Sequence, residues 1–223
     1  MKKFVALLVV GCVFFSSLSA YSEDQARVKR LISGLYDKKT TMDSQRKLIS
    51  YGTEVTEFLV PVLSSENKPY VRIAALRIIG AVEDSRREDD VVLLLSDQDR
   101  KIRQEAARTL SVIALKESTI EPVKKLLNDA DPNVRFNAIR ALAKVARDQE
   151  TQVFVNAMGD YDPRIRLFSV IALGKIKSAE SVGYMSQLVY DYDPEVRFEL
   201  ARSLGEIATK DCVPALFALS TDM

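Results

Sequence analysis

The string Asp-Pro-x-(Val/Ile)-Arg occurs three times in this chain, as Asp131-Pro132-Asn133-Val134-Arg135, Asp162-Pro163-Arg164-Ile165-Arg166 and Asp193-Pro194-Glu195-Val196-Arg197. Its last residue belongs to a longer series of arginines, each after a β-branched residue and each 31 or 32 residues from the next: Arg72, Arg103, Arg135, Arg166 and Arg197. Asp99 keeps the aspartate one repeat earlier, where Arg100 replaces the proline. A period held over five units predicts a repeat architecture.

Each unit contains the signals of two helices. Aspartate is a good N-cap and proline fits the first helical position, so Asp-Pro predicts a helix start. The apolar residues that follow recur at helical spacing, as in Val134, Ala138, Leu142 and Val145. Before this helix another apolar stripe, opened by the capping box Ser118-x-x-Glu121, contains Ile120, Val123, Leu126 and Leu127. Neither helix covers its apolar face alone, so the units must stack, which predicts an all-α solenoid of helical hairpins.

The pattern resembles the HEAT-repeat family, in particular the short HEAT-like repeats of the phycobilisome lyase type. The resemblance covers about residues 53–223, with the last repeat incomplete, and includes the endings Leu173-Gly174-Lys175-Ile176 and Leu204-Gly205-Glu206-Ile207. Residues 23–52 are expected to form an N-terminal helical cap. The resemblance implies a ladder of aspartate and arginine between units, made by Asp99, Asp131, Asp162 and Asp193 with Arg72, Arg103, Arg135, Arg166 and Arg197.

Residues 1–22 have the three parts of a bacterial signal peptide: Lys2 and Lys3, an apolar run over residues 4–15, and small residues up to Ser22. Twelve helical residues rise about 18 Å, too little for a hydrocarbon core of about 30 Å. We therefore expect cleavage, export to the periplasm or medium, and no membrane span in the mature chain. The alternative is a lipoprotein anchored at Cys12, because Val9-Val10-Gly11-Cys12 resembles a lipobox.

Composition argues against most kinds of chemistry. The chain has 32 basic and 31 acidic residues and no histidine, which disfavours nucleic-acid binding through bulk charge and removes imidazole catalysis and His-ligated metals. The deoxyhypusine hydroxylase type binds di-iron through His-Glu pairs, so the lack of histidine excludes that type of site here. The pairs Asp97/Asp99, Asp129/Asp131, Asp160/Asp162 and Asp191/Asp193 are interpreted as turns and caps, not as metal or acid–base sites. We expect no cofactor and no enzymatic activity.

Two residue columns face away from the predicted core on the second helix of each unit. The position directly after the motif arginine holds Ile73, Phe136, Leu167 and Phe198, and the fifth position after it holds Arg77, Arg108, Arg140 and Arg202. An apolar row beside an arginine row predicts a protein-binding groove on the inner face. The alternative is that the apolar residues pack between adjacent units. Tyr161 and Tyr192 share a third column. They are expected either to form an aromatic patch that contacts a partner or to shield their own turns from solvent.

These features predict a non-enzymatic protein-binding or scaffold module whose partner lies in the bacterial cell envelope. The alternative is the docking or regulatory part of a larger enzyme or assembly, with its catalytic segment outside this chain. The repeat spacing calls for another helix start near residue 224, so Val213, Leu216 and Phe217 are expected to form an uncovered apolar end. Either the chain is a fragment of a longer array or that end docks onto another chain.

Overall fold

The computed structural model describes residues 23–113 and 115–221, and within them every regular element is a helix. The predicted leader and Cys12 lie outside these residues. The chain divides into two compact units, unit 1 up to Val82 and unit 2 from Glu83 onward. No helix in the described part is long and apolar enough to span a bilayer.

Unit 1 begins with a helix over residues 23–34 and ends with the long helix α4, Pro69–Ala81. Between them lie α2 (Thr41–Ile49), η1 (Gly52–Val55), α3 (Thr56–Leu59) and η2 (Val60–Leu63), where η marks a 3₁₀ segment. Leu48 of α2 and Leu76 of α4 are fully buried, and these two helices pack together. Arg72 is buried as well and donates from Nε to the Leu63 carbonyl at 2.9 Å.

Unit 2 repeats one hairpin, made of a short first helix, which in three copies ends in a 3₁₀ segment, and a longer second helix. The first helices are α5 (Glu88–Val92) with η4 (Leu93–Ser96), α7 (Glu117–Lys125) with η5 (Leu126–Asn128), α9 (Thr151–Ala157), α11 (Val182–Met185) with η8 (Ser186–Tyr190), and α13 (Val213–Ser220). The second helices are α6 (Arg100–Leu110), α8 (Pro132–Lys144), α10 (Pro163–Lys175) and α12 (Pro194–Ile207). Short 3₁₀ turns, η3 (Ser85–Arg87), η6 (Asp148–Glu150), η7 (Ala179–Ser181) and η9 (Lys210–Cys212), precede α5, α9, α11 and α13.

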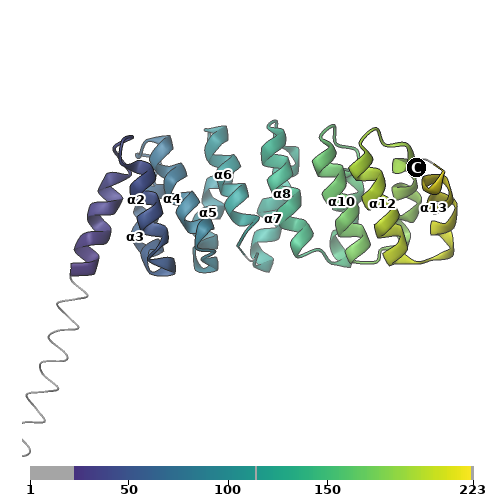
Figure 1. Cartoon of the computed structure of the whole chain (residues 1–223), viewed down its shortest axis with the longest axis horizontal. Helices are drawn as coiled ribbons and strands as arrows, with labels where there is room; N and C mark the ends of the chain where they lie inside the picture. Colours follow the sequence, from purple (N-terminus) through teal and green to yellow (C-terminus); the bar gives the residue numbers. More distant parts are fainter. Residues whose placement is uncertain (1–22, 114, 222–223) are drawn as a thin grey trace, which may run out of the picture. The chain divides into compact units, whose positions relative to one another are not determined.

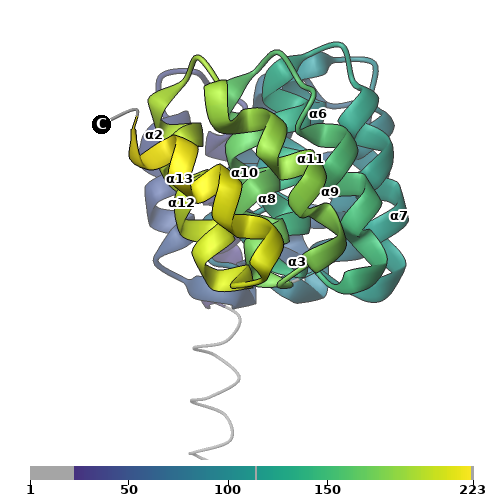
Figure 2. The same ribbon diagram turned by 90° about the vertical axis from the view of Figure 1, so that its right-hand side faces the viewer.

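Within unit 2 the second helices follow one another as neighbours, α6 on α8, α8 on α10 and α10 on α12 (Figure 1). Viewed from the side in Figure 2, α7, α9 and α11 form a separate layer beside them. α10 and α12 approach closely at Gly174, where an added Cβ would lie 2.6 Å from Ser203 Cβ and 2.9 Å from Ser203 Cα. This stack confirms the predicted α-solenoid of helical hairpins.

The aspartate of each Asp-Pro string caps its own helix. The Oδ1 atoms of Asp131 and Asp162 accept the N–H of the residue two positions on, at 2.8 and 3.0 Å, and Asp99 and Asp193 do the same. The capping box expected at Ser118 is wrong, because α7 begins at Glu117 and its N-cap is Lys116. The Lys116 N–H is instead accepted by Oε1 of the buried Glu88, at 2.7 Å.

The ladder between repeats uses the other aspartate of each pair, two residues earlier. Arg103 bonds Asp129, Arg135 bonds Asp160 and Arg166 bonds Asp191, each from Nε to Oδ2 at 2.7 Å. The ladder assignment of Asp99, Asp131, Asp162 and Asp193 is therefore corrected. Those four side chains accept N–H groups of their own helices. Asp131 also lies 3.9 Å from the exposed Arg100 of the preceding repeat, a longer contact than the 2.7 Å bonds of the ladder.

These ladder carboxylates are stabilised in their charged form. Burial opposes the charge of Asp160, but the hydrogen bonds from Arg135 and from the Asp162 N–H outweigh it and lower the pKa of Asp160. The same balance of causes lowers the pKa of Asp129 and of Asp191. The hydrogen bond with Asp160 in turn raises the pKa of Arg135. The ladder is therefore a row of ion pairs that holds neighbouring repeats together.

Candidate functional site

The exposed sides of α6, α8, α10 and α12 form one surface, which we call the second-helix face. Its apolar column consists of Phe136, Leu167 and Phe198, with Gln104 in the same column on α6. Phe136 and Leu167 are half-buried, and Phe198 is 73% exposed. None of the three belongs to the buried core, which contains neighbours such as Ile139 and Val170 instead. Ile73 and Arg77 lie in unit 1, where Ile73 is half-buried and Arg77 exposed.

Phe136 lies in a cluster that joins α8 to α10. Its ring meets Phe168 edge to face, with centroids 5.7 Å apart, and two guanidiniums lie against it, Arg164 at 4.5 Å and Arg140 at 5.6 Å. Arg164 also donates to Asn133 Oδ1 at 3.1 Å, from one repeat to the previous one. Phe136 therefore both packs between repeats and contributes to the surface.

The arginine column differs from repeat to repeat in its partners. Arg108 is paired with Glu105, and Arg202 is paired with Glu199, with Nε 3.0 Å from Oε1. Arg140 stands where the corresponding acidic position is Asn137, and its Nε donates to Ser111 Oγ at 3.1 Å. Within residues 23–113 and 115–221 no carboxylate pairs with Arg140. Burial and the nearby charge of Arg108 lower the pKa of Arg140, so its charge is poorly compensated.

A pocket of about 440 Å³ opens between α10 and α12 on this face. Its lining consists of the apolar residues Leu167, Ile171, Phe198 and Pro194 and of two glutamates, Glu195 and Glu199. Two of these residues, Leu167 and Phe198, were expected in the groove. Ile171 was not among the expected binding residues. It is the fifth residue after Arg166, a position that holds an arginine in the other repeats.

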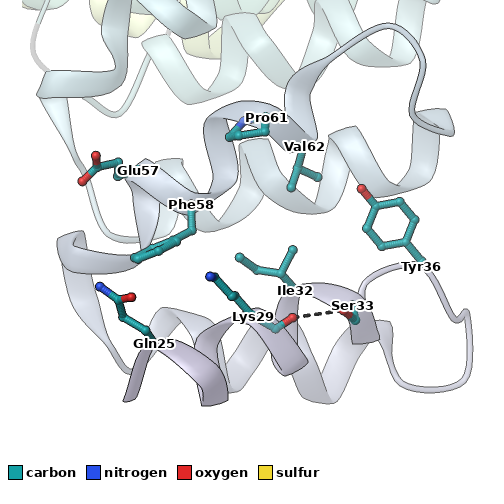
Figure 3. Close-up of a pocket in the computed structure, with 9 residues that line it drawn as sticks. All are labelled: Gln25, Lys29, Ile32, Ser33, Tyr36, Glu57, Phe58, Pro61 and Val62. Atoms are coloured by element: carbon teal, nitrogen blue, oxygen red, sulfur yellow. Dashed lines mark hydrogen bonds between the residues drawn. The ribbon is translucent and has the colours of Figure 1, made fainter. Parts of the chain in front are cut away.

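A second pocket, of about 600 Å³, lies in unit 1 and was not anticipated from the sequence (Figure 3). It lies between the helix over residues 23–34, which contributes Gln25 and Lys29 to its lining, and the segment of α3 and η2, which contributes Glu57 and Phe58. Figure 3 shows the side chains of Lys29 and Phe58 pointing toward one another across it. No sequence pattern reveals it, because it depends on the distance between two packed helices.

The described residues contain no group of three or more Cys, Asp or Glu side chains placed to hold a metal ion. The arrangement on the second-helix face offers apolar contact, one poorly compensated guanidinium and two neutralised ones. Apolar contact area beside charged guanidiniums is the kind of chemistry that protein interfaces use.

Comparisons with known proteins agree with this architecture. A family model of HEAT repeats matches residues 56–129 and 120–191, and one of the PBS lyase HEAT-like repeat matches residues 196–219. No curated protein sequence matches the chain.

Several solved structures have the same fold at low sequence identity. The Escherichia coli protein YibA is 20% identical, with a TM-score of 0.69 over 89% of this chain and 77% of that one. A designed armadillo repeat protein in complex with the peptide (KR)4 is 19% identical, with a TM-score of 0.59 over 80% and 98% of the two chains. The complex of CpcE and CpcF of phycocyanin lyase from Nostoc sp. PCC7120 is 11% identical, with a TM-score of 0.57 over 88% and 94%.

Proposed function

Because this chain belongs to the HEAT-repeat family, we propose that it is a protein-binding module without catalysis of its own, whose second-helix face holds a partner in the bacterial cell envelope. The observation that carries this proposal is the pocket lined by Leu167, Ile171 and Phe198, in which Phe198 is 73% exposed. Exposed aromatic rings beside an apolar hollow are typical anchors of protein interfaces.

The chemistry of the face defines the kind of segment that it fits. An extended chain that crosses α8, α10 and α12 would place an apolar side chain in the pocket beside Phe198. One or two repeats away, Arg140 provides a guanidinium without a carboxylate, which suits an acidic residue of the same segment. Arg108 and Arg202 contribute less, because Glu105 and Glu199 already neutralise them.

The similar fold of the designed armadillo repeat protein, which holds a (KR)4 peptide, supports peptide binding by stacked helical repeats. The basic sequence of that peptide is a property of that complex. The groups on the face of the present chain favour an apolar and acidic segment instead.

The proposed location in the cell envelope rests on the leader predicted at residues 1–22. Intact-mass measurement on protein from the native host tests it, with an expected N-terminus at Tyr21 or Glu23. A diacylated or triacylated form that begins at Cys12 would establish the lipoprotein alternative, and a retained Met1 would contradict export by either route.

The binding proposal is tested by crosslinking in intact cells followed by mass spectrometry. We compare the wild type with a Leu167→Ser/Phe198→Ser variant, and we use Tyr184→Ser as the matched control because Tyr184 is an exposed aromatic residue on the first-helix layer. An envelope protein captured by the wild type and the control, and lost from the double variant, is the expected result. Equal capture by all three forms would show that the second-helix face does not bind the captured protein.

A further inference from the structure

The position just before each capping aspartate decides what covers the ladder arginine of the preceding repeat. In the last complete repeat this residue is Tyr192, whose ring centroid lies 4.5 Å from Arg166 Cζ. Its hydroxyl donates to the Tyr161 carbonyl at 3.0 Å, and Arg166 Nη1 donates to that hydroxyl at 3.3 Å. Tyr192 thus stacks on a guanidinium and is fixed at its polar end.

Tyr161 holds the same position one repeat earlier and behaves differently. Its side chain is 94% exposed, and within the part of the chain that the structure describes its hydroxyl has no hydrogen-bond partner and its ring does not stack on Arg135. The Arg135 side chain is 17% exposed, against 6% for Arg166 under Tyr192. The Arg103 side chain, which has only Ala130 at this position, is 20% exposed. Tyr161 therefore leaves Arg135 almost as open as an alanine does.

A cavity of about 610 Å³, here called the Arg135 cavity, adjoins Arg135 and is lined by α7 and η5, by α9 and by the turn that follows α9. Arg135, Asp160 and Tyr161 line it together with apolar residues such as Val153 and Ile165. The carbonyl partners of Arg135 match those of Arg166. Arg135 Nη1 donates to the carbonyls of Asp129 and Ala130 at 2.9 and 3.3 Å, just as Arg166 Nη1 donates to those of Asp160 and Tyr161 at 2.9 and 3.2 Å.

We infer that the Arg135 cavity is a binding site for a tyrosine side chain of a protein partner, which stacks on the Arg135 guanidinium and donates its hydroxyl to the Ala130 carbonyl. The repeat symmetry of the chain supplies the model of the bound state, because Tyr192 makes both contacts one repeat later. A guanidinium attracts the face of an aromatic ring, and tyrosine is enriched among interface anchors. The site is lined by the first helices and an Asp-Pro turn and not by the apolar and arginine columns of the second-helix face, so it does not depend on the proposed function.

The experiment follows the side-chain Nε–H signals of the arginines in the full chain by NMR, with N-acetyl-tyrosinamide as the probe. We expect the probe to shift the Arg135 signal in a saturable way and to leave the Arg166 signal unchanged, because Tyr192 fills that site. N-acetyl-phenylalaninamide, which lacks the hydroxyl, should bind Arg135 several-fold more weakly.

Tyr192→Ala is the gain-of-site control. Tyr192 is 71% exposed and Arg166 keeps its bonds to Asp191, so this variant should fold and should acquire a probe-dependent shift at Arg166. Absence of an Arg135 shift in the wild type overturns the inference, whether or not Arg166 responds in the variant. A shift at Arg135 that appears only in Tyr161→Ala also overturns it, because Tyr161 would then occupy the cavity itself. A shift that depends on protein concentration without probe, and disappears in Tyr161→Ala, would overturn it in favour of a second copy.

Discussion

Arg135 and Asp160 are joined by two parallel hydrogen bonds across the boundary between repeats, from Nε to Oδ2 at 2.7 Å and from Nη2 to Oδ1 at 3.0 Å. The same carboxylate accepts the N–H of Asp162 at 2.9 Å. Asp160 therefore fixes the turn of its own repeat and the helix of the preceding one, whereas Asp162 caps a single helix.

This difference predicts the relative cost of two neighbouring substitutions. Asp160→Ala removes a charge-assisted pair and leaves the largely buried Arg135 without its carboxylate, which should cost about 2–3 kcal/mol. Asp162→Ala removes an N-cap and should cost about 0.5–2 kcal/mol. Urea unfolding of the two variants checks the order. A larger loss from Asp162→Ala would return the ladder role to the capping residue.

The ladder also predicts how stability depends on pH. Because the pKa values of Asp129, Asp160 and Asp191 are lowered in the folded chain, the unfolded chain binds more protons in acid. Their contribution to stability is complete above the unfolded pKa, about 3.9, and is lost as the pH falls through the lower folded values. In a series from pH 7 to pH 2, the urea concentration at the unfolding midpoint should therefore decrease once the pH falls below about 4–5. Asp191→Asn should make this decrease smaller. An unchanged acid limb in that variant would contradict the assignment.

Two glycines on adjacent second helices provide a matched pair for testing the stack. Gly174→Ala should destabilise by about 1–3 kcal/mol, because the new Cβ meets the Cα and Cβ of Ser203 and forces α10 and α12 apart. Gly205→Ala places its Cβ in open space and should stabilise by up to about 1 kcal/mol through helix propensity. Thermal unfolding gives both signs, and equal effects at the two positions would argue against the close approach.

Phe198 and Phe136 share a column and should differ in stability. Phe198→Ser should cost about 0.5 kcal/mol or less, as for other surface changes, because its ring is mostly exposed. Phe136→Ser should cost about 1–3 kcal/mol, because it removes contacts with Phe168, Arg140 and Arg164. Losses of about 3 kcal/mol or more at both positions would make the rings core residues, as the packing alternative requires.

The sequence predicts this fold well because its signals are local. A capping aspartate, a proline and an apolar stripe define each second helix, and Asp131, Asp162 and Asp193 cap as expected. The ladder partner was misassigned because two aspartates stand two residues apart, and only the folded turn shows which one faces the preceding arginine. The apolar residues expected at the last helix are found exposed at Val213 and Phe217, while Leu216 is half-buried.

Features that depend on the packing of side chains could not be predicted from the sequence. Tyr161 and Tyr192 are equivalent in the repeat, yet only Tyr192 covers its arginine. The column at Phe136, Leu167 and Phe198 was placed on the correct helix surface by angle. Its graded exposure arises from neighbours such as Arg164 and Phe168, which differ between repeats.

Binding of a partner by the second-helix face can be measured as the affinity of the purified partner for three forms of the chain. Leu167→Ser/Phe198→Ser should raise the Kd at least about tenfold, a loss of about 1.4 kcal/mol, with a urea midpoint close to that of the wild type. Tyr184→Ser should leave the Kd unchanged. An unchanged Kd for the double variant, or an equal loss from Tyr184→Ser, would contradict the account.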